Sequence, residues 1–259
     1  MPLQGGAFDL GCHGYNHISA NELTVSDYDL EIKEAIEFLR QTFPDQRVNT
    51  FAAPYNTVND SFIKYLDDYA IGCRIGSNGE QGFLGKSTDM YRVKSVSLNQ
   101  NTDFKSVHYQ IDSLVKSGAW VVQLVHTVTQ GQPYESVGIS KATLDEHCAY
   151  LYNSYNGSVW FASFQDVAMY ALQHKNVKIT TIDLTGDKMV FNVSTTLDTQ
   201  VYNVPMSVKV YLPSFASSAY ALVNGERQEL EIKTDGANKY ACVLDVSIEN
   251  STLEICFND

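Results

Sequence analysis

The chain has 259 residues, of which 44% are hydrophobic and 19% are charged. These values are typical of globular proteins and argue against wholesale disorder. The length suits one large domain or two ordinary ones, and we expect two. A formal net charge of -12 without a basic stripe argues against nucleic acid and anionic membranes as partners. No apolar run approaches the roughly 18 residues of a membrane span. The first six residues carry neither the basic nor the apolar segment of a secretory signal.

The first part of the chain alternates strand and helix patterns. Expected strands are short, mostly apolar runs at residues 7–10, 48–53, 69–75, 91–98, 119–125 and 159–164. Expected helices, most with an apolar stripe of helical period, cover residues 26–43, 58–66, 102–118, 140–151 and 166–172. This alternation is typical of a parallel sheet that is buried on both faces. In such sheets the chemistry collects at the carboxyl ends of the strands.

The pattern changes at about Asn176. Seven short alternating strands follow, joined by Gly, Asp and Asn turns, at residues 177–182, 189–195, 206–212, 219–223, 229–232, 240–246 and 252–257. They predict an immunoglobulin-like β-sandwich. We therefore divide the chain into a domain at residues 1–175 and a second at residues 176–259.

The sequence of the sandwich contains no motif that indicates catalysis. Its possible roles are to bind glycan, to serve in adhesion or assembly, or to pack against the first domain.

The five cysteines form no Cys-x-x-Cys pair, and their odd number does not define a disulfide framework. Cys242 and Cys256 lie on neighbouring predicted strands and could pair, but buried free thiols are the simpler interpretation. No catalytic cysteine is indicated.

His13 and His17 follow the first predicted strand. If the segment coils helically, two histidines four residues apart share one face and can reach one divalent metal ion. Two unrelated surface histidines are the alternative. Gly14 stands where a zincin protease has glutamate, which argues against a metalloprotease. Pro54 and Tyr55 follow the second strand and His126 ends the fifth, so these three signals should meet on one rim of the sheet.

These motifs resemble those of the polysaccharide deacetylases, carbohydrate esterases that include chitin and peptidoglycan deacetylases. The resemblance depends on the order of the motifs along the chain, and it extends from about residue 3 to residue 175. The family's His-x-x-x-His is matched by His13 and His17, and its Phe-Arg-x-Pro-Tyr-Gly is matched in part by residues 51–56. A histidine after a hydrophobic strand is matched by His126, and residues 159–168 look like the family's last strand and helix.

The resemblance implies a distorted (β/α) barrel and a metal-dependent hydrolysis of N- or O-acetyl groups on a polysaccharide or oligosaccharide. By the same resemblance, His13 and His17 would hold zinc or another divalent first-row metal, and His126 would be the general acid. Pro54 and Tyr55 would shape the substrate site, and Arg92 lies where a further substrate motif is expected. Such proteins act outside the cell, in the periplasm or at the cell surface.

The departures from the family are specific. Its Thr-Phe-Asp-Asp-Gly motif is absent, and alanine stands at positions 52 and 53 in place of the motif arginine. Either an upstream strand has been lost from the chain, or the protein is a natural remnant. In both cases the metal would be held weakly and catalysis impaired, so whether the chain is an enzyme stays open. A non-catalytic carbohydrate-binding or surface protein on a degenerate scaffold is the alternative. A missing first strand would leave a sheet edge that could dimerise.

Overall fold

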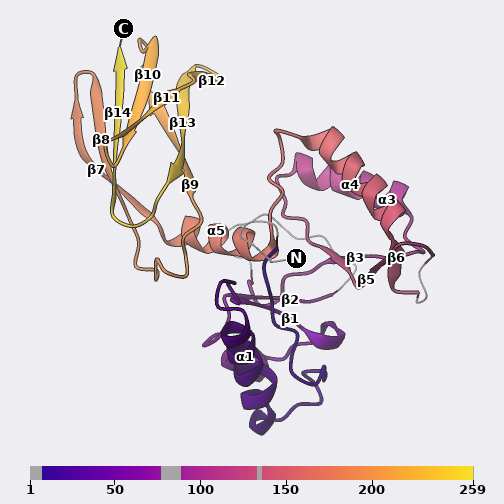
Figure 1. Cartoon of the computed structure of the whole chain (residues 1–259). Coiled ribbons are helices and arrows are strands. Elements are labelled where there is room, and N and C mark those ends of the chain that lie inside the picture. The colour runs from indigo at the N-terminus through magenta and orange to yellow at the C-terminus, as the bar shows by residue number, and fades with distance from the viewer. Residues whose placement is uncertain (1–7, 77–88, 133–135, 259) are drawn as a thin grey trace. The chain divides into compact units, whose positions relative to one another are not determined.

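The computed structural model describes residues 8–76, 89–132 and 136–258 (Figure 1). The chain divides into two units between Ala168 and Met169. This boundary falls inside helix α5 (Phe164–Asn176), whereas the sequence placed it at the end of that helix. Within the described ranges, no helix has both the length and the apolar character that crossing a membrane requires.

The helices of the first unit follow the expected stripes. They are η1 (Val25–Asp27), the π-helical η2 (Asp29–Glu34), α1 (Ala35–Thr42), η3 (Pro54–Asn56), α2 (Asp60–Leu66), α3 (Phe104–Lys116), α4 (Lys141–Tyr155) and α5. The first helical stretch begins slightly earlier than expected. Its cap is Thr24, whose backbone N–H donates to the Asp27 carboxylate at 2.8 Å. At α2 the cap itself is the acceptor, because the Asn59 side chain accepts from Phe62 N at 2.9 Å.

The strands of the first unit form parallel pairs, as predicted. They are β1 (Thr50–Ala52) with β2 (Gly72–Arg74), β3 (Val96–Leu98) with β4 (Gln123–Val125), and β5 (Thr127–Thr129) with β6 (Gly138–Ser140). Single bridges from Cys12 to Phe51 and from Arg74 to Val93 extend the first pair. The last pair was not expected. The predicted strand at residues 159–164 is wrong, because no strand occurs there and α5 begins at Phe164.

Over the described residues these pairs are separate sheets rather than one continuous sheet, and a closed barrel is not seen. The strands are also less buried than predicted, since β4 is only half-buried and much of β5 is exposed. A parallel α/β arrangement is therefore observed, while the barrel remains an expectation from the family resemblance.

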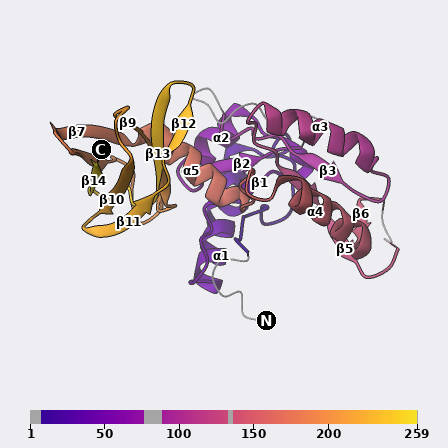
Figure 2. The ribbon, with the colours of Figure 1, turned by 90° about the horizontal axis from the view of Figure 1, so that it is seen from above.

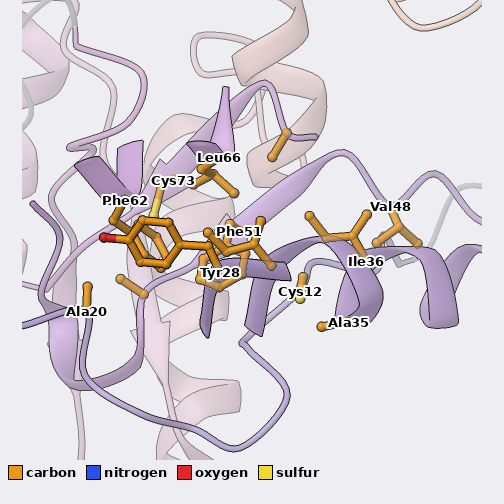
Figure 3. Packing of buried hydrophobic residues seen from close by; sticks show 13 residues of the cluster. Cys12, Ala20, Tyr28, Ala35, Ile36, Val48, Phe51, Phe62, Leu66 and Cys73 are labelled. Carbon is orange, nitrogen blue, oxygen red and sulfur yellow. The ribbon is translucent and has the colours of Figure 1, made fainter. Parts of the chain in front are cut away.

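A buried cluster joins the helices to β1 and β2 (Figure 3). Tyr28, Ile32 and Ile36 form its helical stripe, and the rings of Phe51 and Phe62 meet with centroids 5.6 Å apart. Cys12 and Cys73 are buried in the same cluster. The five cysteines, all within the described residues, are free thiols. The cluster holds Cys12 beside β1. The segment after Cys12 and the segment after β1 therefore leave the sheet at the same edge.

The second unit contains antiparallel strands in two sheets (Figure 2). The strands are β7 (Lys178–Thr185), β8 (Lys188–Ser194), β9 (Met206–Leu212), β10 (Ser218–Val223), β11 (Glu226–Leu230), β12 (Lys233–Asp235), β13 (Asn238–Val246) and β14 (Ser251–Asn258). One sheet has the order β11-β10-β14-β8-β7 and the other β12-β13-β9. Val208 and Val243 of the smaller sheet share one buried cluster with Leu253 and Ile255 of the larger. The expected run of short strands is thus confirmed, with β12 as an addition.

Candidate active site

The histidine pair meets through an irregular loop, not through a helix as the sequence suggested. Residues 13–17 are not helical, and the backbone is left-handed at Gly14 (φ +80°) and His17 (φ +58°). The two imidazole rings lie with centroids 4.7 Å apart in an edge-to-face arrangement. The His17 ring makes a second edge contact with Tyr55 at 4.8 Å. The structure therefore brings His13, His17 and Tyr55 together from two separate loops.

The buried carboxylate of Glu31 holds this loop by hydrogen bonds. Its side chain is 3% exposed. The carboxylate accepts hydrogen bonds from Tyr15 N at 3.0 Å, Asn16 N at 3.1 Å and Asn16 Nδ2 at 2.6 Å. A Cβ on Gly14 would lie 3.1 Å from Glu31 Oε2, so glycine is required both for the backbone angle and for the space. The buried carboxylate is satisfied by the loop, and the loop geometry depends on it.

The second loop of the site is also held in an uncommon backbone conformation. Tyr55 (φ 52°) and Asn56 (φ 61°) are left-handed within the short turn η3, which Pro54 begins. With His17 they make three of the six non-glycine residues of positive φ among those described. Such conformations cost about 1–2 kcal/mol each and concentrate at functional sites. The turn leaves the Tyr55 side chain 64% exposed beside His17.

The His13 ring is oriented by a backbone carbonyl. Nδ1 lies 2.6 Å from Ala52 O. Because a carbonyl only accepts, Nδ1 carries the proton and donates it, which leaves the lone pair of Nε2 free. The pKa of His13 is lowered, mainly because packing around the ring disfavours the charged form, with added repulsion from His17, Arg74 and His126. A neutral histidine with its second nitrogen bound to a carbonyl has the form of a metal ligand.

The donor set for a metal is nevertheless incomplete. Over the described ranges, no group of three His, Cys, Asp or Glu side chains could hold an ion. Catalytic zinc usually has three protein ligands. The carboxylate of Asp9 is engaged elsewhere, by Arg47 at 3.1 Å and by the hydroxyl of Ser163. Two imidazoles alone do not fit a catalytic zinc site.

The remaining predicted residues differ in their placement. His126 follows β4 with an exposed side chain, near enough to His13 to affect its protonation. Arg92 donates from Nη1 to Asp89 at 2.8 Å and from Nη2 to Asp60, the first residue of α2. Neither contact connects Arg92 to the histidine pair. The roles given to these residues in catalysis and substrate binding stay predictions.

A cavity of about 310 Å³ lies next to Ala52, and neither His13 nor His17 lines it. It is bordered by β1, β2, β4 and the start of α5, and Ala52, whose carbonyl binds His13, is part of its wall. Sequence reasoning missed its polar residues Arg74 and Gln165, as it missed Glu31. Two signals were available: Arg74 is a charged residue at the end of an apolar strand, and Glu31 directly precedes the buried Ile32.

Comparisons with known proteins agree with the motif analysis. Residues 3–72 match the family model for polysaccharide deacetylase. This segment contains His13, His17 and Tyr55, and the predicted family resemblance is confirmed for it. The chain is also similar to a gellan lyase of a Bacillus species, with 23% identity over 206 residues. That match covers 73% of this chain and only 8% of the lyase, so the chain spans a small part of the relative's length.

Proposed function

We propose that this chain is a polysaccharide deacetylase-like protein that binds an acetylated glycan at the rim formed by His13, His17 and Tyr55. One observation carries the proposal. In the family-matched segment the His13 and His17 rings lie 4.7 Å apart, and the His17 ring lies 4.8 Å from the ring of the exposed Tyr55. The name of the similar gellan lyase designates a polysaccharide as its substrate, which supports a glycan as ligand. An extracellular, periplasmic or cell-surface location follows from such a substrate.

Each side chain has a task in this proposal. The rings of Tyr55 and Tyr15, 64% and 58% exposed, offer apolar faces to sugar rings. His126 would protonate the leaving amine or hydroxyl. His13 and His17 would offer two imidazoles to zinc or another divalent metal. Because a third donor is lacking among the described residues, tight metal binding and efficient hydrolysis are not expected from these residues alone.

The test combines zinc calorimetry with an acetate-release assay on acetylated chito-oligosaccharide. Wild type is compared with His13→Ala and His17→Ala, and His174→Ala on α5 serves as the control for loss of an exposed histidine. Zinc binding and acetate release that both disappear in the two site variants, and persist in the control, support the deacetylase. Acetate release that persists in His13→Ala would contradict it.

A second function, glycan binding without catalysis, is favoured by one specific observation. Among the described residues, no third metal ligand joins the two histidines. In addition, alanines stand at positions 52 and 53, where the family motif has arginine. This function predicts that the oligosaccharide binds without zinc and without acetate release. Tyr55→Ala should then weaken binding, while Tyr109→Ala, which removes a 78% exposed ring on α3, should not. Equal binding by both variants would place the glycan elsewhere.

A further inference from the structure

The cavity next to Ala52 contains an unpaired buried donor. Gln165 is 1% exposed, and its Oε1 accepts from Asn49 N at 2.9 Å. This bond fixes the orientation of the amide, since the carbonyl oxygen has to face the N–H. Nε2 is then the atom without a hydrogen-bond partner, the one such buried side-chain atom among the described residues. A buried N–H₂ group without an acceptor is unfavourable, so this wall of the cavity suits a water or a ligand atom that accepts a hydrogen bond.

A positive charge lies in the same cavity. Arg74 ends β2 opposite Ala52 of β1 and lines the cavity with Gln165. One of its nitrogens, Nη1, donates to Asn56 Oδ1 at 2.5 Å. No carboxylate of residues 8–76, 89–132 or 136–258 forms an ion pair with Arg74. The guanidinium has five N–H groups in a planar fork, and the described residues supply one acceptor for them, Asn56 Oδ1.

The acidic residue of the cavity does not cancel this charge. Asp9 also lines the wall, but its carboxylate is bound by Arg47 Nη2 at 3.1 Å and by the Ser163 hydroxyl. Arg47 also donates to Asp166 at 2.7 Å, so it is shared between two carboxylates and compensates Asp9 only in part. Among the described residues the cavity therefore combines a cation without an ion-pair partner, a buried amide nitrogen without an acceptor and a carboxylate already engaged by Arg47 and Ser163, so the free groups on its wall are donors that suit an acceptor ligand.

We propose that this cavity binds the carboxylate of a uronic acid unit in the glycan. A carboxylate accepts through two coplanar oxygens and matches the planar fork of Arg74, while one oxygen can also take the Gln165 amide. The volume of about 310 Å³ is at the small end of ligand pockets and suits a single sugar unit. Ala52 links the cavity to His13, so a neighbouring sugar would reach the histidine rim. The proposal rests on the proposed function only in taking a glycan as the ligand.

Calorimetry on the full chain tests this directly. The probes are an oligogalacturonate and its methyl ester, which has the same sugar backbone without the negative charge. The acid should bind at least tenfold more tightly than the ester. Arg74→Gln and Gln165→Glu should each abolish this preference. Gln165→Glu keeps the acceptor for Asn49 N and replaces the free donor by an oxygen, and because it buries a charge its urea unfolding is measured beside that of wild type. Arg227→Gln is the control: it removes a cation from the exposed ion pair with Glu229 on β11 and should leave the preference for the acid unchanged.

Several outcomes would overturn the proposal. Equal affinity for acid and ester would do so, as would wild-type behaviour of Arg74→Gln and Gln165→Glu. Competition by inorganic phosphate as strong as that by the uronate would reduce the cavity to a general anion site. Acetate release from neutral acetylated chito-oligosaccharide without any uronate preference would refute this inference alone. Uronate binding that depends on Arg74, with neither binding nor hydrolysis of the neutral acetylated glycan, would instead refute the deacetylase proposal.

Discussion

The carboxylate of Glu31 accepts hydrogen bonds from both the backbone N–H and the side-chain amide of Asn16, at 3.1 and 2.6 Å. Through these bonds the helical segment η2 holds the loop that separates His13 from His17. The distance between the two imidazoles therefore depends on a buried acid that has no chemical role of its own. This residue is the first place where the geometry of the site can be tested.

Glu31→Gln should lower the free energy of unfolding by about 1.5–3 kcal/mol, the range for hydrogen bonds to a charged group. The substituted amide has one acceptor and places an N–H₂ group against the loop donors. Urea denaturation followed by circular dichroism measures the loss. Glu34→Gln, in the same segment but exposed, should change stability by less than about 0.5 kcal/mol. Similar losses in the two variants would mean that the loop does not depend on the carboxylate.

Gly14→Ala should destabilise the protein more than Gly157→Ala does. Both glycines have nearly the same left-handed backbone, with φ of +80° and +81°, so the strain of about 1–2 kcal/mol is common to both. A methyl group at position 157 meets nothing within 4 Å, whereas at position 14 it would lie 3.1 Å from Glu31 Oε2. Thermal and urea unfolding of the two variants isolates this contact. Equal losses would show that backbone strain alone requires Gly14.

The stability of the protein should fall as the pH decreases from 7.5 to 5.5. Burial lowers the pKa of His147, with repulsion from His108 as the second cause, and the pKa of His13 is lowered by its packing. His147 bonds to His108 at 3.0 Å and to Gln123 at 3.1 Å. The unfolded chain takes up protons near its ordinary pKa of about 6.5, above the folded values, so acid favours unfolding.

The loss cannot exceed about 1.4 kcal/mol per pH unit for each histidine. Urea unfolding across this pH range measures the slope. The double variant His13→Gln/His147→Gln should show a flatter dependence than wild type. A wild-type stability that is flat or rises toward pH 5.5 would contradict the lowered pKa values of both histidines.

Cys12 and Cys73 should resist thiol reagents in the native protein. Burial raises the pKa of Cys12 to about 11 and that of Cys73 to about 12, so both thiols are protonated at pH 8. Cys148 and Cys242 are exposed and should react within the fast phase of a DTNB assay. The triple variant Cys148→Ser/Cys242→Ser/Cys256→Ser, which also removes the partly exposed Cys256, should lose that phase, and urea should then release the two buried thiols. Fast modification of Cys12 or Cys73 in the native state, located by mass spectrometry, would show that the core around β1 opens readily.

Local patterns predicted much of the fold. The stripe from Tyr28 to Ile36 became a helix on the core, and the runs around Phe51 and Cys73 became parallel strands, because side-chain periodicity reports burial of one face. The prediction for the run at residues 159–164 failed because its apolar character does not reflect burial. Trp160 and Phe161 are 52% and 51% exposed, and Phe164 begins a helix. At the site, the order of His13, His17 and Tyr55 along the chain was enough to find them, but not to explain how they meet.

By itself the sequence determined the alternation of helices and parallel strands, the antiparallel strands after residue 176 and the family resemblance now confirmed for residues 3–72. Each of these is recorded in short-range spacing. Only the tertiary structure decided that Glu31 supports the histidine loop. It also decided that Gln165, whose amide nitrogen has no hydrogen-bond partner among the described residues, lines a cavity. The bond from Asn49 to Gln165 joins residues 116 positions apart. Contacts of that kind depend on the packing of the whole unit and leave no periodic trace along the chain.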